Sequence, residues 1–313
     1  MTFSGSARVI LVANRKGGVG KSTTVAAIAQ QIATGGRRGG RRVLVIDGDA
    51  QGNCTEDDLG TQASDAGRGL AKTLQFGAPL EPVRGVRPNI DIIPGGGALS
   101  LVSASIHAMR ENGIDMAAHL QDQLEALCAA EGYDLVLIDT GPGEVPLLET
   151  FLRVANYLII PTKSDESSFK GVAKLAKHFF AAQRAGASIK LLGVLLFGAD
   201  HRAFRRNEDL LEQLSEMLGN SGVEPFGVVI RHSESASIDA RSRGVSLSEL
   251  PEIAEEEQQE ILSSLKKKEK PDRKLWSSNP AGVAADYQQL VYEMIKRLAQ
   301  FEQESPRAVV VGA

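Results

Sequence analysis

The chain is poor in cysteine and in aromatic residues. Its only cysteines are Cys54 and Cys128, which lie far apart without the spacing of a metal site, and this usage is typical of a reducing cytosol. Aromatic residues make up 5% of the chain and do not alternate with the basic clusters. This scarcity argues against a stacking platform for single-stranded nucleic acid.

The chain also lacks an excess of positive charge and a long apolar run. Lysine and arginine total 35 against 39 acidic residues, so any contact with DNA must come from a local patch. No apolar run approaches the roughly 20 residues that a membrane span requires, and the first residues show no secretory signal. We therefore expect a soluble cytoplasmic protein.

What the sequence does contain is an alternation of strand-like and helix-like segments. Most of the strand-like runs are continuously apolar, as expected when both faces of a parallel sheet are covered. The pattern predicts an α/β fold: a doubly wound, mostly parallel sheet with helices on both faces. The strands are predicted at residues 8–13, 42–46, 90–93, 135–138, 157–160, 191–197 and 226–230, and the helices at 22–34, 99–110, 116–130, 169–185 and 207–218.

We expect one domain over residues 1–313, with three stretches that stand apart from the alternation. A charged insertion at about 252–278 begins acidic and ends basic, which matches the dipole of an exposed helix. A C-terminal helix follows at about 281–301, and residues 304–313 read as a disordered tail.

The most informative motif is Asn-Arg-Lys-Gly-Gly-Val-Gly-Lys-Ser-Thr-Thr at residues 14–24, directly behind an apolar run. A strand that leads through a glycine-rich turn into a helix predicts a phosphate cradle, because backbone N–H groups and the helix N-terminus face one anion. Lys21 would reach the β- and γ-phosphates of a nucleotide, and the Ser22 hydroxyl would bind Mg²⁺. The predicted cradle comprises Gly17, Gly18, Val19, Gly20, Lys21, Ser22 and Thr23.

Carboxylates follow the strands that would end beside this cradle. Asp47 and Asp49 come after the run at 43–46, and Asp139 comes after the run at 135–138. Ligands of open α/β sheets bind beyond the carboxyl ends of the strands, so these acids are expected to converge on the phosphates. Asp139 has the setting of a Walker-B acid that holds Mg²⁺. Asp49 could orient the attacking water, with Asp47 supporting the magnesium shell.

These motifs together resemble the ParA-type partition ATPases, a group with a deviant Walker motif that also contains MinD. The resemblance is carried by residues 16–23, by the Asp-Gly-Asp-Ala-Gln-Gly-Asn segment at 47–53 and by the strand that ends at Asp139, and it covers most of residues 7–250. The chain departs from the family pattern at Ala50, where proline is common, and at residues 140–143, Thr-Gly-Pro-Gly. Neither departure removes a catalytic group.

The resemblance implies an ATP- and Mg²⁺-dependent homodimer in which Lys16 reaches the phosphates of the partner subunit. It also implies non-specific binding of double-stranded DNA, a location on the nucleoid, and ATP hydrolysis stimulated by a ParB-like centromere-binding protein. The cargo would be a plasmid or a chromosome origin. Lys16, Lys21 and Asp49 would then be the catalytic residues, and Ser22, Asp47 and Asp139 the metal site.

Contacts with DNA would come from basic residues in the C-terminal half of the chain. The alternative interpretation of each is a solvated helix face. The contacts would be to backbone phosphates and would depend steeply on salt. The candidate residues are Arg202, Arg205, Arg206, Arg231, Arg241 and Arg243.

Two other functions remain open at this point. A MinD-like membrane-cycling ATPase would need a C-terminal amphipathic anchor, and the helix at 281–301 is followed by Glu-Gln-Glu-Ser-Pro instead. We therefore expect no membrane partner. A ligase of the dethiobiotin-synthetase type would use the same phosphate loop with a small-molecule acceptor.

Overall fold

A computed structural model describes residues 7–35, 40–200, 202–219, 222–243, 245, 247–266, 277 and 279–304. Its centre is an eight-stranded sheet in the order β3-β4-β2-β5-β1-β6-β7-β8. All neighbouring strands pair in parallel except β3 and β4, which form an antiparallel pair at one edge. The strands are β1 (Arg8–Val12), β2 (Val43–Gly48), β3 (Val83–Arg87), β4 (Ile90–Ile93), β5 (Leu135–Thr140), β6 (Tyr157–Thr162), β7 (Lys190–Ala199) and β8 (Val229–Arg231).

The central strands are apolar because they are buried on both faces. Every residue of β2, β5 and β6 is buried. In β1, Leu11 belongs to the hydrophobic core on one face, whereas Ile10 and Val12 belong to the core on the other. The alternation of side chains along each strand therefore supplies two cores with one sheet, as the sequence predicted.

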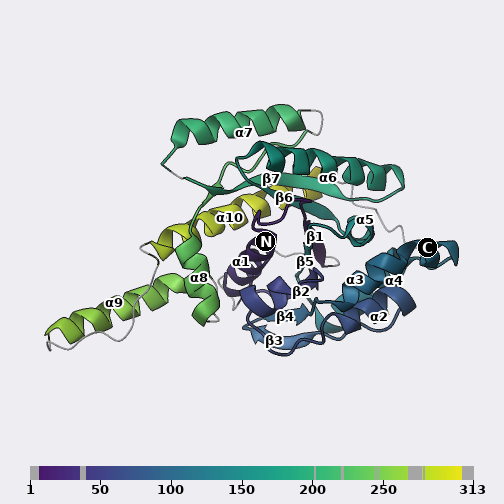
Figure 1. Ribbon diagram of the computed structural model, residues 1–313, viewed down its shortest axis with the longest axis horizontal. Helices are drawn as coiled ribbons and strands as arrows, with labels where there is room; N and C mark the ends of the chain where they lie inside the picture. The colour runs from purple at the N-terminus through teal and green to yellow at the C-terminus, as the bar shows by residue number, and fades with distance from the viewer. Residues whose placement is uncertain are drawn as a thin grey trace.

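Helices cover both faces of the sheet (Figure 1). One core includes residues of α2 (Arg68–Phe76), α3 (Ala98–Glu111), α4 (Met116–Glu131), α5 (Val145–Val154), α6 (Glu166–Arg184) and α7 (Phe204–Leu218). The other includes residues of α1 (Lys21–Thr34), α8 (Glu234–Arg243), α9 (Leu250–Lys266) and α10 (Pro280–Glu304). Within the described residues, none of these helices combines the length and apolar character needed to cross a bilayer.

The charged stretch after α8 contains a helix, α9, which points away from the sheet in Figure 1. The predicted helix at 281–301 is α10, which is slightly longer than expected. Most of the remaining insertion, at 267–276 and 278, lies outside the described residues, and so does nearly all of the predicted tail, at 305–313. The single-domain division of the chain stays a prediction.

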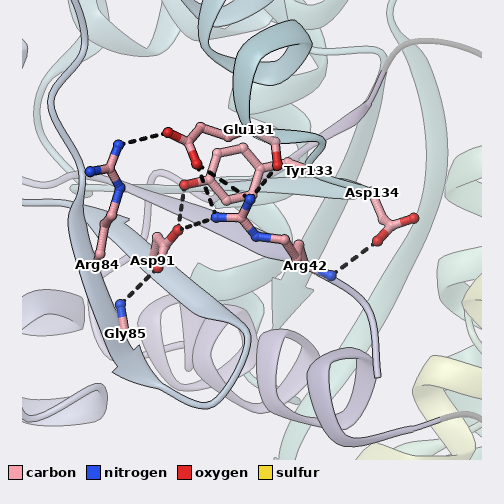
Figure 2. Close-up of polar contacts among 7 residues, drawn as sticks. All are labelled: Arg42, Arg84, Gly85, Asp91, Glu131, Tyr133 and Asp134. Atoms are coloured by element: carbon pink, nitrogen blue, oxygen red, sulfur yellow. Dashed lines mark hydrogen bonds and ion pairs between the residues drawn. The ribbon is translucent and has the colours of Figure 1, made fainter. Parts of the chain in front are cut away.

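A polar cluster around Asp91, the second residue of β4, links the amino ends of β2, β4 and β5 (Figure 2). Asp91 is 6% exposed and accepts hydrogen bonds from the Gly85 N–H at 2.7 Å, the Tyr133 hydroxyl at 2.5 Å and the Arg42 guanidinium at 3.0 Å. Arg42 also donates to the main-chain carbonyl of Glu131. The cluster joins β2, the β3–β4 hairpin and the turn before β5 at the edge opposite to the phosphate loop.

Candidate functional site

The phosphate loop joins the carboxyl end of β1 to the first turn of α1. Gly18 and Gly20 adopt left-handed conformations, with φ of 69° and 81°, which glycine adopts without a steric penalty. Gly20 occupies the N-cap of α1, and among the described residues no side chain caps this end. The first N–H groups of α1 are thus directed into the loop, where the helix dipole favours an anion.

The loop is held in place by neighbours from β6, β7 and α6. Asn14, which is 2% exposed, donates to the Pro161 carbonyl at 2.7 Å and accepts from the Lys16 N–H at 3.0 Å. At Gly20 a Cβ atom would lie 2.3 Å from the Phe197 ring, so only glycine fits there. At Gly171 a Cβ would lie 2.7 Å from the Asn14 Oδ1, which explains how α6 approaches the loop so closely.

The Lys21 side chain lies inside the loop. It is 6% exposed, and its ammonium group donates to the Lys16 carbonyl at 3.2 Å. Burial lowers the pKa of Lys21, while the charges of Asp139 and Asp49 oppose the shift. The loop therefore holds a desolvated cation beside two carboxylates, next to the N-terminus of α1.

Asp139 lies near the end of β5 and is fully buried. Neither of its carboxylate oxygens has a hydrogen-bond partner of normal geometry among the described residues. Burial raises the pKa of Asp139 well above its ordinary value, the Asp47 charge raises it further, and the nearby Ser22 hydroxyl and Lys21 ammonium oppose the shift. A buried carboxylate without partners is unfavourable, and a divalent cation would satisfy it.

The described residues contain no cluster of three or more acidic, histidine or cysteine side chains arranged for a metal ion. A metal at Asp139 would therefore take most of its ligands from Ser22, water and phosphate oxygens. This is the usual way in which Mg²⁺ binds beside a nucleotide. The donor set fits Mg²⁺ with ATP, and it does not fit a resident structural metal.

Asp47 and Asp49 lie beside Asp139, but their hydrogen bonds differ. Both oxygens of Asp47 accept hydrogen bonds, Oδ1 from the Asp49 N–H at 3.1 Å and Oδ2 from the Thr55 N–H at 2.8 Å and hydroxyl at 2.7 Å. Burial raises the pKa of Asp47 to about 6. Asp49 is 6% exposed, and its side chain accepts from the Gln51 N–H at 3.0 Å. Thr55 was not identified from the sequence.

Lys16, the additional lysine of the loop, does not point into its own loop. Its ammonium group lies 3.3 Å from Asp165 Oδ1 and also donates to the Ser167 hydroxyl, and both partners are at the start of α6. The Lys16 side chain is 37% exposed. The two lysines of the motif therefore lie in different environments: Lys21 is buried in the loop, and Lys16 is at its exposed rim.

A pocket of about 340 Å³ adjoins the loop between the ends of β7 and β8 and the start of α10. Gly18, Thr23, Phe197, Arg231 and Tyr287 are among its lining residues. Its lining combines aromatic, apolar and polar residues and includes Gly18 and Gly20 of the phosphate loop. Such a mixed lining suits a small organic ligand.

The basic residues predicted to contact DNA fall into two groups. Arg202, Arg205 and Arg206 are exposed at the start of α7, where Arg206 donates weakly to the Ser164 hydroxyl at 3.4 Å. Arg231 instead makes a two-pronged ion pair with Asp286, with both distances 2.7 Å. Asp286 therefore holds the Arg231 guanidinium within the fold.

Arg243 is likewise paired internally, with the buried Glu257 of α9. The Arg241 side chain lies outside the described residues. Arg231 and Arg243 would each have to leave a largely buried carboxylate before contacting DNA. An exposed arginine avoids that cost.

The chain is similar to known proteins in sequence and in structure. A family model described as an AAA domain matches residues 7–190. The chromosome-partitioning ATPase Soj of Thermus thermophilus is 34% identical over 226 residues, which cover 71% of this chain and 80% of that protein.

Among solved structures, the ATP complex of Cyanothece McdA has a TM-score of 0.69 at 18% identity, with 95% of this chain and 98% of that one covered. The structure of pNOB8 ParA bound to nonspecific DNA has a TM-score of 0.58 at 22% identity, with 94% and 99% covered. At such identities the likeness establishes the fold alone. The fold is that of a phosphate-loop nucleotide-binding protein.

Proposed function

Because the chain belongs to the AAA-domain family that includes the ParA and Soj partition ATPases, we propose that it moves DNA by cycles of ATP binding and hydrolysis. The protein is an ATPase. The observation that carries the proposal is that the two lysines of the loop differ in environment. Lys21 is buried beside Asp139, whereas Lys16 is at the exposed rim of the same loop.

We propose that ATP binds with its triphosphate in the loop of residues 17–23 and its base in the pocket beside Phe197. The N–H groups of α1 and the Lys21 ammonium would hold the phosphates, and Ser22 and Asp139 would hold Mg²⁺. When bound, Mg²⁺ would neutralise charge that develops on the transferred phosphoryl group. Asp49 would orient the attacking water, and Asp47 would support this arrangement by its hydrogen bond to the Asp49 N–H.

The active form is proposed to be a homodimer in which two nucleotides face each other. Two triphosphates brought together need additional positive charge, and Lys16 can supply it from the opposite subunit. The exposure of Lys16 supports this role, because its ammonium can leave Asp165 without a change in the core. Burying that charge against phosphate would make the dimer depend on ATP.

We propose that the dimer binds double-stranded DNA without sequence preference through Arg202, Arg205 and Arg206. Arg202 lies just before α7, and Arg205 and Arg206 are in its first turn. A dimer would present this exposed set twice to the phosphates of the DNA backbone. A protein that binds DNA in this way would be cytoplasmic and associated with the nucleoid. A ParB-like centromere-binding protein would stimulate hydrolysis and so release the dimer from DNA.

The test is the steady-state ATPase rate of the full chain with Mg²⁺, alone, with non-specific duplex DNA, and with DNA plus the product of the adjacent gene. We expect little hydrolysis alone and a clear increase with DNA and partner together. Pelleting with anionic vesicles but not with DNA would instead support a MinD-like ATPase. Hydrolysis that depends on a small-molecule acceptor and ignores DNA would support a ligase.

A further inference from the structure

Thr55, the second residue of a π-helical turn at Cys54–Asp58, lies directly behind the aspartates of the site. It is fully buried. Its N–H and its hydroxyl both donate to Asp47 Oδ2, at 2.8 and 2.7 Å, and the same hydroxyl accepts from the Gly95 N–H at 3.1 Å. A single side chain thus links Asp47 to the loop between β4 and α3.

The hydrogen bonds continue from Asp47 to Asp49. Asp47 Oδ1 accepts from the Asp49 N–H at 3.1 Å. The Asp49 carbonyl in turn accepts from the Gly52 N–H at 3.1 Å and the Gly96 N–H at 3.0 Å. The main chain of Asp49 is therefore held at its N–H by Asp47 and at its carbonyl by the β4–α3 loop.

The β4–α3 loop closes on Asp47 at van der Waals distance. A Cβ atom at Gly95 would lie 2.6 Å from Asp47 Cγ, which no side chain can tolerate without displacing the carboxylate. A Cβ at Gly97 would meet no described atom within 4 Å. Of these two glycines, only Gly95 lies this close to Asp47, and Gly95 is also the residue whose N–H donates to the Thr55 hydroxyl.

We propose that Thr55 is a positioning residue for ATP hydrolysis, which together with Gly95 fixes Asp47 and thereby the place of Asp49. Thr55 itself contacts no part of the phosphate loop in these hydrogen bonds, so it acts on the reaction only through the aspartates. Thr55 fixes the Asp47 carboxylate with two hydrogen bonds, and the fixed carboxylate can then hold the Asp49 N–H in place. This inference rests on the proposed role of Asp49 in orienting water.

The proposal makes a specific kinetic prediction. Thr55→Val keeps the size of the side chain and the N–H but removes the hydroxyl, whereas Thr55→Ser keeps the hydroxyl. We expect Thr55→Val to lower kcat about 10-fold or more, with KM for ATP and the Mg²⁺ requirement within about 2-fold of wild type. Thr55→Ser should restore most of the rate.

The loop supplies an independent pair of variants. Gly95→Ala should lower kcat in the same way, because the added methyl group displaces Asp47, while Gly97→Ala should leave kcat unchanged. A matched control for the threonine is Thr150→Val, since Thr150 is 2% exposed and, among the described residues, its hydroxyl donates only to the Pro146 carbonyl within α5, at 3.0 Å. If Thr55→Val does not fold, the two glycine variants decide the question.

The measurements for each full-length variant are steady-state kcat and KM for ATP and the single-turnover rate of bound ATP, with ATP affinity and the melting temperature measured in parallel. A lower melting temperature with an unchanged rate per bound ATP would show a merely structural role and overturn the proposal. So would a loss confined to Mg²⁺ affinity, which would make Asp47 a metal ligand instead.

Asp49→Ala separates this inference from the proposed function. If Asp49→Ala hydrolyses ATP normally, the proposed role of Asp49 is wrong whatever Thr55 does. If Asp49→Ala is inactive while Thr55→Val and Gly95→Ala are normal, only the role of Thr55 is wrong.

Discussion

The Lys16 ammonium lies 3.3 Å from Asp165 Oδ1, so the lysine expected to cross to a second subunit is bound within its own chain. Asp165 is the N-cap of α6, and hydrogen bonds from Ser167 and Ser168 hold its pKa below the ordinary value. The pair is largely exposed, and exposed ion pairs contribute only about 0–1 kcal/mol. A triphosphate from a second subunit could therefore outcompete Asp165 for this lysine.

Lys16→Ala should keep ATP binding and lose ATP-dependent dimerisation, because its charge acts across the interface. Light scattering after size exclusion, with and without ATP and Mg²⁺, measures the effect. Lys170→Ala is the control, since Lys170 is an exposed lysine of α6 that pairs only with Glu166 in the hydrogen bonds and ion pairs described. An ATP-dependent dimer of normal affinity in Lys16→Ala would contradict the assignment.

Asp139→Asn should remove the stabilisation that ATP gains from Mg²⁺. The Asp139 oxygens, which have no hydrogen-bond partner of normal geometry in the part of the chain that the structure describes, make it the best-placed carboxylate for the metal. Asp47, in contrast, already accepts three hydrogen bonds. In the wild type, ATP with Mg²⁺ should raise the melting temperature more than ATP with EDTA does. In Asp139→Asn the two conditions should give the same melting temperature, and the exposed Asp57→Asn should behave as wild type.

The sheet and the phosphate loop could be predicted from the sequence because their signals are local. Continuous apolar runs identify strands buried on both faces, and Gly-Lys-Ser-Thr behind such a run identifies the loop. The weaker elements were missed for the same reason. In β3 every residue is partly or fully exposed, so it lacks a clear pattern, and the short helices α2, α5 and α8 were not separated from the surrounding loops.

The contacts within the site could not be predicted, because they join residues far apart in the chain. Nothing near Lys16 in sequence indicates that its ammonium lies beside Asp165, 149 positions away. Likewise, nothing in the sequence distinguishes Gly95 from other loop glycines, and only the structure shows that its N–H donates to the Thr55 hydroxyl. Arg231 illustrates the same difficulty, since its charge is visible in the sequence and its ion pair with Asp286 is not, and its contact with DNA stays a prediction.

The exposed arginines of α7 should account for the salt dependence of DNA binding. We expect Arg205→Ala and Arg206→Ala each to weaken binding of the ATP-bound protein to duplex DNA equally across sequences. Each should also reduce the slope of log K against log salt by about 1 for every DNA phosphate that the arginine neutralises in the wild type. Fluorescence anisotropy at several salt concentrations measures both quantities.

Arg84→Ala is the matched control for these variants, because Arg84 is 64% exposed on β3 and pairs with Glu131 (Figure 2). It should leave the affinity and the slope unchanged. If the α7 variants bind as tightly as wild type at every salt concentration, DNA binds elsewhere.

The polar cluster around Asp91 should stabilise the fold without affecting catalysis. Tyr133→Phe removes one hydrogen bond to a buried carboxylate and should lower the free energy of unfolding by about 1–3 kcal/mol. Asp91→Ala should lower it further, because it leaves the Tyr133 hydroxyl and the Gly85 N–H without an acceptor. Urea unfolding measures both, and a fall in ATPase rate without a loss of stability would be contrary to this expectation.

The ion pair between Asp115 and Arg153 should make stability depend on pH in the acid range. The Arg153 guanidinium donates to both Asp115 oxygens, at 2.8 and 2.6 Å, and this interaction lowers the pKa of Asp115. An acid with a lowered pKa in the folded state contributes stability above its unfolded pKa, and that contribution is lost as pH falls through the folded pKa. Asp115→Asn keeps an acceptor for the N-cap of α4 and removes the charge.

We therefore expect Asp115→Asn to melt below wild type at pH 7, by no more than about 2 °C because the pair is exposed. The difference should shrink steadily toward the lowest pH at which both proteins still fold. Glu166→Gln is the control, since its pair with Lys170 is far more exposed and should give no difference at any pH. A difference for Asp115→Asn that stays constant with pH would mean that packing or capping, and not charge, stabilises this end of α4.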